Sequence, residues 1–240
     1  MVPQRLDIPL RERLIVALDL PRMLDARNMV AALGDEVVFY KLGLQQVFGG
    51  GLGLVDELFR LGKKVFLDAK LTDIAATVGN ATTNIARTGC EFLTVTGDAP
   101  IVRAAVEARS NAGARKPLIL AVTVLTSLDQ RDIEDMGFSM SLDELVAHRA
   151  LKAKEAGADG VIASGFEAAR LRALLGPEMR IVTPGIRSAD SPKDDQKRVM
   201  TAGDAIRAGA DHVVVGRDIL RSAKPAQKAR AILDDIADAL

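Results

Sequence analysis

The sequence predicts a single (β/α)8 barrel, an α/β fold in which eight parallel strands alternate with helices. Three observations lead to this prediction. Short apolar runs recur along the chain with helical patterns between them. The runs are continuously apolar, which is typical of parallel strands that are covered on both faces. The same connection, a Gly that follows a helical pattern and precedes an apolar run, occurs four times, as expected of a barrel built from repeated units.

The expected strands can be placed in order along the chain. They cover residues 14–18, 37–40, 64–67, 92–95, 118–122, 160–163, 180–182 and 212–215. The repeated connection reads Leu61-Gly62-Lys63-Lys64, Thr88-Gly89-Cys90-Glu91, Ala156-Gly157-Ala158-Asp159 and Ala208-Gly209-Ala210-Asp211. The alternative fold is an open doubly wound sheet, which is built from the same alternation of strands and helices.

We expect one domain over residues 1–240, because no linker or low-complexity segment interrupts the pattern. Residues 1–12 form a short N-terminal extension, which is charged and does not resemble a signal peptide. Two connections are longer than the others. Residues 126–141 follow the fifth strand and end in a capping box that opens a helix. Residues 185–196 follow the seventh strand and are predicted to be a lid over a site at the barrel mouth.

The composition excludes several classes of protein. Lys plus Arg and Asp plus Glu each number 32, so the net charge is zero, which argues against a general nucleic-acid or membrane-surface binder. The longest apolar stretch, residues 118–125, is too short to span a bilayer. Cys90 is the only cysteine, so no intrachain disulfide can form. These features favour a cytoplasmic protein.

The stretch from Val65 to Ile74 is central to the functional prediction. In a regular strand, Phe66, Asp68 and Lys70 would share one face, so a buried strand would present an acid and a base to the same side. Burying ions costs several kcal/mol each, by rough estimate, unless they are paired. Taken alone, this stretch fits either a structural ion pair or a catalytic group.

Polar residues follow six of the eight expected strands, at the ends where barrels place their active sites. They are Asp19, Lys41, Asp68, Lys70, Asp73, Thr123, Thr126, Ser127, the segment 183–187 (Thr-Pro-Gly-Ile-Arg), Gly216, Arg217 and Asp218. A single acid or lysine after a strand is usually a solvated loop residue. The agreement of six strand ends favours a functional site.

The last two strands indicate a site for an anion. Gly216 and Arg217 precede a predicted helix start, and Gly185 and Arg187 lie after the neighbouring strand. Gly allows close approach of the backbone, and Arg binds phosphate. A phosphorylated small molecule is the expected substrate. Asp68 and Asp73 could hold Mg²⁺, but Lys70 and Lys41 would compete for the same carboxylates, so we expect no metal. No nicotinamide, flavin or P-loop motif is present.

These motifs resemble those of the orotidine 5′-phosphate decarboxylase family, in its bacterial form. The resemblance rests on Asp68–Ile74, Thr183–Arg187, Asp195-Gln196 and Val215–Arg217, in the family's order, and extends from about residue 13 to the final helix. Lys41 adds specificity, because sugar-phosphate relatives carry a Mg²⁺-binding acid at that place. The sequence departs from the commonest pattern of the family at Thr72, at Ala75-Ala76 and at Val95-Thr96-Gly97.

The resemblance implies a lyase that decarboxylates orotidine 5′-phosphate to uridine 5′-phosphate in pyrimidine biosynthesis without a cofactor. Lys70 would protonate the carbanion at C6, and Asp68 would hold Lys70 beside the departing carboxylate. Lys41 and Asp19 would hold ribose hydroxyls, and Lys41 and Asp73 would complete a row of alternating charges with Asp68 and Lys70. Thr126 and Ser127 would contact the pyrimidine. The residues that would bind the phosphate are Arg187, Gln196, Gly216 and Arg217, and Gln196 would also bridge from the lid to the ring.

The resemblance also implies a homodimer, in which Asp73 and Thr77 reach into the site of the partner subunit. Two alternatives stay open from the residues alone. One is a Mg²⁺-dependent sugar-phosphate decarboxylase or aldolase, against which Lys41 argues. The other is a non-catalytic nucleotide-binding barrel, which would need the phosphate groups but not the row of Asp68, Lys70 and Asp73.

Overall fold

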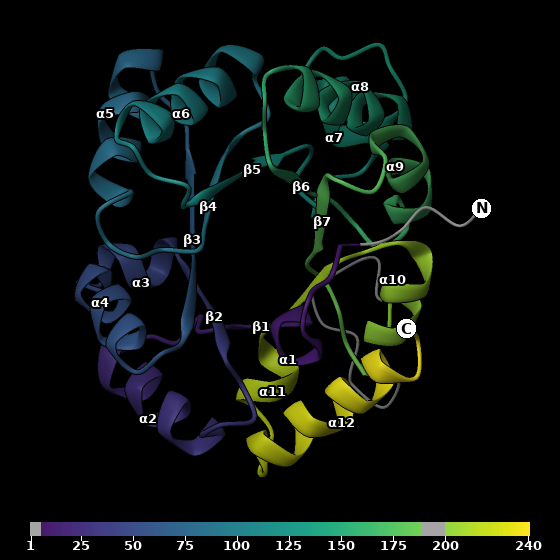
Figure 1. The fold of residues 1–240 in the computed structure, drawn as a ribbon. Coiled ribbons are helices and arrows are strands. Elements are labelled where there is room, and N and C mark those ends of the chain that lie inside the picture. Colours follow the sequence, from purple (N-terminus) through teal and green to yellow (C-terminus); the bar gives the residue numbers. More distant parts are fainter. Residues whose placement is uncertain (1–5, 189–199) are drawn as a thin grey trace.

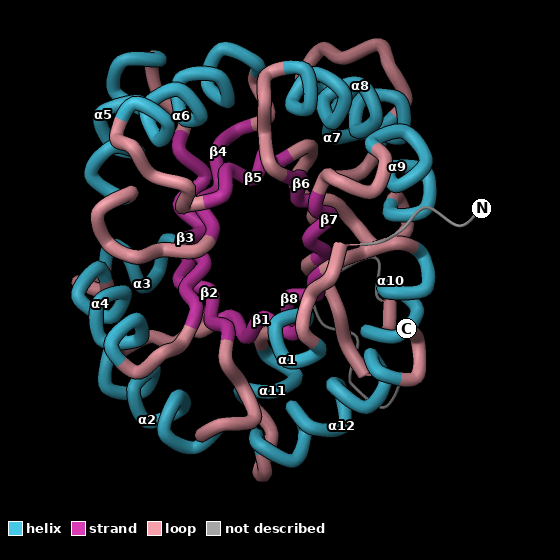
Figure 2. The backbone as a smooth tube through the Cα atoms, in the orientation of Figure 1, coloured by secondary structure: helices cyan, strands magenta, loops and turns pink. Residues whose placement is uncertain are grey.

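Eight parallel strands close into one barrel in the order in which they occur in the chain, and the helices surround it (Figures 1 and 2). This computed structural model describes residues 6–188 and 200–240. The strands are β1 Leu14–Ala17, β2 Phe39–Gly43, β3 Lys64–Leu71, β4 Phe92–Thr96, β5 Leu118–Val122, β6 Gly160–Ile162, β7 Arg180–Thr183 and β8 His212–Val215. The predicted barrel is confirmed, and the open sheet is wrong because β1 pairs with β8.

Helices precede, connect and follow the strands. They are α1 Leu10–Arg13, α2 Met23–Leu33, α3 Leu44–Phe48, α4 Leu52–Arg60, α5 Ala75–Ile85, α6 Ala99–Asn111, α7 Gln130–Asp135, α8 Leu142–Glu155, α9 Ala168–Leu175, α10 Ala202–Ala208, α11 Arg217–Leu220 and α12 Pro225–Ala237. The helices α2 to α10 connect the strands on the outside of the ring, whereas α1 precedes β1 and α11 and α12 follow β8 (Figure 2). The predicted capping box is present, because Ser141 accepts the backbone N–H of Glu144 and the Glu144 carboxylate accepts that of Ser141. No helix among the described residues is long and apolar enough to cross a membrane.

The core has two parts, as expected for strands that are covered on both faces. A large cluster fills the space between the strands and the helices. A second cluster fills the interior of the barrel and consists of Ile15, Ala17, Phe39, Phe66, Phe92, Leu120, Val182 and Val214. Near the N-terminal ends of the strands, the rings of Phe39 and Phe92 lie 5.0 Å apart. The ring of His212 lies edge-on to both of them. This aromatic floor closes the barrel opposite the end where an active site is expected.

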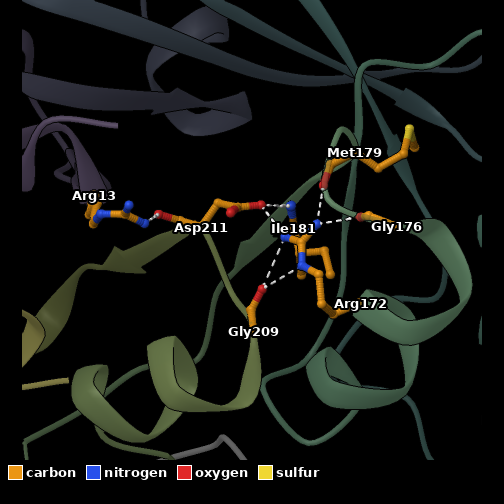
Figure 3. A network of polar contacts seen from close by, with 7 residues as sticks. All are labelled: Arg13, Arg172, Gly176, Met179, Ile181, Gly209 and Asp211. Atoms are coloured by element: carbon orange, nitrogen blue, oxygen red, sulfur yellow. Dashed lines mark hydrogen bonds and ion pairs between the residues drawn. The ribbon is translucent and has the colours of Figure 1, made fainter. Parts of the chain in front are cut away.

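Two acids of the repeated Gly-Ala-Asp connection fasten neighbouring strands at this floor. The carboxylate of Asp211 accepts the backbone N–H of Ile181 at 2.8 Å and pairs with Arg172, while Arg13 donates to its carbonyl (Figure 3). Arg172 also donates to the carbonyls of Gly176, Met179 and Gly209. Asp159 repeats the arrangement with Ile119 and Arg109. The repeated connection therefore has a structural role as well as marking the helix ends.

The expected N-terminal extension and the expected lid are only partly described. Within the expected N-terminal extension, α1 packs beside β1, β8 and α12, so its last residues belong to the barrel floor. Of the expected lid, the structure describes residues 185–188, and Ile186 forms a parallel β-bridge with Met200. Gln196 and the rest of the expected lid lie outside the described residues.

Candidate active site

A cavity of about 490 Å³ opens at the C-terminal ends of the strands. This volume is in the range of pockets that bind small molecules. Among the predicted site residues, those that line the cavity are Asp19, Lys41, Asp68, Lys70, Thr126, Arg187, Gly216 and Arg217. Asp218, which the sequence also placed at a strand end, lines it as well. Residues from six different strand ends thus meet in one cavity, as the barrel topology predicts.

The charged side chains form an alternating row along one wall. Lys41 Nζ lies 3.3 Å from Asp19 Oδ1 and 3.3 Å from Asp68 Oδ2. Lys70 Nζ lies 2.9 Å from the other oxygen of the same carboxylate, Asp68 Oδ1. The order along the wall is therefore Asp19, Lys41, Asp68, Lys70. Because opposite charges alternate, each buried ion has a partner and the row can exist away from bulk water.

Asp68 is the centre of this row and is buried, with 8% of its surface exposed. Burial by itself raises the pKa of the Asp68 carboxyl, because it disfavours the charged form. The positive charges of Lys41 and Lys70 and the hydrogen bonds from Lys70 and Thr94 outweigh burial, so the pKa lies below its ordinary value. Asp68 is therefore a carboxylate, and it presents negative charge to whatever binds beside it.

The backbone at Lys70 departs from a regular strand. Leu67 pairs with Leu93 and Leu71 with Val95, so three residues of β3 face the single residue Thr94 of β4. Lys70 has a φ of 45°, and it is the one non-glycine residue with a positive φ among the described residues. Simple strand alternation is therefore the wrong reason for placing Lys70 beside Asp68. A bulge places it there, and such strained backbone occurs often at functional sites.

The predicted anion site lies where β7 and β8 end, and β8 is the neighbour of β1 in the barrel. Arg187 is buried, follows β7 and is held by a hydrogen bond of 3.1 Å from its backbone N–H to the carbonyl of Met200. Arg217 is half-buried and begins α11, directly after Gly216. Asp218 accepts hydrogen bonds from the backbone and the hydroxyl of Ser188 at 2.9 and 2.8 Å. These contacts join the base of the expected lid to the end of β8.

Three predicted residues lie outside the cavity of their own chain. Ser127 is exposed and does not line it, although Thr126 does. Asp73 and Thr77 are exposed on the surface after β3, and Asp73 accepts the backbone N–H of Ile74 at 2.6 Å. In the described chain the fourth member of the charge row is Asp19, not Asp73. The predicted contribution of Asp73 and Thr77 to a partner subunit stays a prediction.

Some residues of the site were not identified from the sequence. Much of the cavity lining is apolar, and its members beyond the predicted segment 183–187 are Ala17, Phe66, Val122, Val124, Leu125, Ile162 and Val214. Gln45 also lines the cavity. Thr94 donates to Asp68 from the neighbouring strand. The one signal that pointed to Thr94 was a polar residue between the apolar residues Leu93 and Val95 of β4.

Comparison with known proteins identifies the family. A family model described as "Orotidine 5'-phosphate decarboxylase / HUMPS family" matches residues 12–232. The chain belongs to this family. The orotidine 5′-phosphate decarboxylase of Rhodopseudomonas palustris (strain HaA2) is 50% identical over 95% of this chain and 96% of its own length. The orotidine 5′-phosphate decarboxylase of Afipia carboxidovorans is 49% identical over 95% of each chain. The resemblance seen in the sequence is thus confirmed.

Two solved structures share the fold. The crystal structure of orotidine 5′-phosphate decarboxylase from Lactobacillus acidophilus superposes with a TM-score of 0.84 at 32% identity, over 94% of this chain and 99% of that one. An uncharacterized conserved protein from Geobacillus kaustophilus superposes with a TM-score of 0.81 at 31% identity, over 93% and 99% of the two chains. The barrel described above is therefore the fold of its relatives.

Proposed function

We propose that this chain decarboxylates orotidine 5′-phosphate to uridine 5′-phosphate, in the cytoplasm and as a step of pyrimidine biosynthesis, without a cofactor. The observation that carries the proposal is the alternating row of Asp19, Lys41, Asp68 and Lys70 at one end of a cavity. Two arginines, Arg187 and Arg217, line the same cavity. Membership of the family and the curated relatives at about 50% identity support the same activity.

The reaction needs such a row because its intermediate is poorly stabilised by the substrate itself. Loss of CO2 leaves an electron pair at C6 in the plane of the pyrimidine ring, where conjugation cannot spread it. Preorganised charge in a water-poor site stabilises such a carbanion, because the protein groups need no reorganisation during the reaction. The required reduction of the barrier lies toward the upper end of the roughly 8–23 kcal/mol that enzymes provide.

Each member of the row has a role in the proposed step. The C–C bond to the carboxylate breaks, CO2 leaves, and the electron pair stays at C6. Lys70 stabilises that charge and transfers a proton from Nζ to C6, so that the product is uridine 5′-phosphate with a neutral uracil ring. Asp68 lies beside the departing carboxylate and holds Lys70 through the contact of 2.9 Å. Lys41 and the half-exposed Asp19 hold ribose hydroxyls.

The far end of the cavity binds the phosphate. Arg187, Gly216 and Arg217 contact it, with Gln196 bridging from the lid to the pyrimidine, and Thr126 and Ser127 contact the ring. An arginine binds phosphate oxygens through paired hydrogen bonds, which fixes orientation as well as affinity. Binding energy from this remote group closes the lid and assembles the charged row around the reacting carbon.

The proposed active unit is a homodimer with shared sites. Asp73 and Thr77 are exposed on the surface just beyond the charged row and take no part in the cavity of their own chain. In a two-fold dimer the same surface of each subunit meets its copy, so both residues can enter the partner's site. Asp73 would then extend the alternation of charge beyond Lys70.

The contacts of Lys41 argue against the Mg²⁺-dependent alternative. Its Nζ lies between Asp19 and Asp68 at 3.3 Å from an oxygen of each, which is where a divalent cation would bind these two acids. The non-catalytic alternative gives no reason for a strained Lys70 backbone that positions a buried ion pair. Both alternatives therefore explain less of the site than decarboxylation does.

The test is the loss of orotidine 5′-phosphate absorbance by the purified protein with EDTA present. We expect turnover that EDTA does not change, and no turnover by Lys70→Ala at the same protein concentration. Absence of turnover by the folded wild type would refute the proposed function. Turnover that EDTA abolishes and Mg²⁺ restores would favour the metal-dependent alternative instead.

A further inference from the structure

We propose that Thr94 is a positioning residue for the reaction: its hydroxyl fixes both the Asp68 carboxylate and the strained backbone of Lys70. The inference rests on the proposed function, and it adds a residue that neither the sequence motifs nor the family match assigns. Thr94 lies on β4, next to β3, and its side chain is fully buried.

The hydroxyl of Thr94 makes two hydrogen bonds with different roles. It accepts the backbone N–H of Lys70 at 3.0 Å. It lies 2.9 Å from Asp68 Oδ1, and because an ionised carboxylate can only accept, the hydroxyl is the donor there. One oxygen atom on β4 thus binds the acid and the base of the charged row at once.

The bulge explains why a side chain is needed at this point. Three residues of β3 face Thr94 alone, so the regular ladder has no carbonyl for the N–H of Lys70. A buried N–H without a partner destabilises the conformation that contains it. Lys70 also has the positive φ of 45°, which an L-residue adopts only where its surroundings enforce it. The hydroxyl of Thr94 supplies the missing acceptor and so stabilises this conformation.

The same bond limits the motion of Asp68. Oδ2 of the carboxylate faces Lys41 at 3.3 Å, and Oδ1 faces Lys70 at 2.9 Å. Long lysine side chains adjust easily, so these ion pairs alone leave the carboxylate free to rotate. A hydroxyl on a buried strand holds Oδ1 from a third direction, and β-branched Thr has a stiff side chain. The orientation of the row relative to the substrate is therefore fixed from β4.

The test compares the variants Thr94→Val and Thr94→Ser in the orotidine 5′-phosphate assay. Valine keeps the shape and loses the hydroxyl, whereas serine keeps the hydroxyl. We expect Thr94→Val to lower kcat by about ten- to a hundredfold. A loss of this size corresponds to the free energy of one hydrogen bond to a charged group. Its KM should stay within about threefold, since the phosphate site is untouched. Thr94→Ser should keep kcat within about threefold of the wild type.

A matched control separates this effect from the loss of any buried hydroxyl. Thr82 on α5 is also fully buried, and its hydroxyl donates to the carbonyl of Val78 at 2.9 Å within the helix. Thr82→Val should therefore leave kcat unchanged. Equal kcat in Thr94→Val and wild type would overturn the proposal. An equal loss in Thr94→Val and Thr94→Ser would also overturn it, because the hydroxyl would not be the cause.

A crystal structure of Thr94→Val tests the positioning without any assay. We expect Lys70 to leave the left-handed region, or its Nζ to move beyond about 3.5 Å from Asp68 Oδ1. Unchanged geometry at both places would refute the inference. If the wild type showed no turnover while this geometry changed as expected, the positioning role would stand and the proposed function would fail.

Discussion

His212 is predicted to make the stability of the barrel depend on pH. Its ring is buried in the aromatic floor, and Nδ1 lies 2.8 Å from the carbonyl of Glu12. Because a carbonyl only accepts, Nδ1 is the donor in the neutral ring. Nε2 is buried without a hydrogen-bond partner among the described residues. A second proton would therefore have to be placed on Nε2 in the apolar interior.

The size of the effect follows from the shift of its pKa. Burial lowers the pKa of His212 from 6.5 to about 3, and the charges of Arg180, Arg13 and Lys64 act in the same direction. The folded protein then binds fewer protons than the unfolded chain between these two values, so stability falls as the pH drops through that window. Between about pH 8 and about pH 5, the loss in free energy of unfolding is about 2 kcal/mol.

The assay is urea unfolding followed by far-UV circular dichroism, at fixed protein concentration and at several pH values between these limits. His212→Phe keeps a ring in the floor and removes the titrating group, so it should lack the loss of about 2 kcal/mol. Near pH 8 it should be less stable than the wild type by about 1–3 kcal/mol, because the Glu12 carbonyl loses its donor. This difference should shrink by about 2 kcal/mol toward pH 5, where only the wild type has lost stability.

The chain supplies its own control, since it has only two histidines. His148 is exposed on α8, so His148→Gln should keep the pH dependence of the wild type. If His212→Phe lost as much stability as the wild type over the same range, the neutral buried imidazole would not be the origin of the effect. The reasoning from burial would then be refuted.

Three further predictions concern the proposed reaction. Lys70→Ala should lower kcat by at least about a hundredfold, because a general acid is lost. The variant should still fold and bind uridine 5′-phosphate in calorimetry. Readily measurable turnover would remove Lys70 as the proton donor. Arg217→Ala should lower kcat/KM by about ten- to a hundredfold for the full substrate and have little effect on a substrate without phosphate; an equal effect on both would contradict the phosphate role. Lys70→Ala and Asp73→Ala, each inactive alone, should regenerate about a quarter of the wild-type sites when unfolded, mixed and refolded. No activity beyond the sum of the two mutants, where refolded wild type recovers, would place Asp73 in the site of its own subunit.

The fold could be predicted from the sequence because its signal is local. Continuous apolar runs and the repeated Gly connection located all eight strands. The boundaries were less accurate where a strand carries charge. The third strand was expected to end at Leu67 but continues to Leu71, because its charged side chains point into a cavity and not into loop solvent. Charged residues inside a strand are therefore easily mistaken for the end of that strand when only the sequence is known.

The site could be predicted where a residue lies at or just after the C-terminal end of a strand. Asp19, Lys41 and Arg217 lie in one cavity because barrel topology brings all the strand ends together. Ser127 was placed with Thr126 although it does not line the cavity, since the path of a loop depends on packing that the sequence does not encode locally. The role of Thr94 could not be predicted from the sequence, because it comes from a bulge on another strand.

The backbone of Lys70 also limits how this protein can be engineered for heat resistance. A left-handed conformation costs an L-residue about 1–2 kcal/mol, and glycine alone among the standard residues adopts it freely. Glycine carries no ammonium group, so no standard substitution can relieve the strain at position 70 and keep the chemistry. A thermostable variant that remains active has to gain its stability elsewhere, and the buried floor at the opposite end of the barrel is the natural place to seek it.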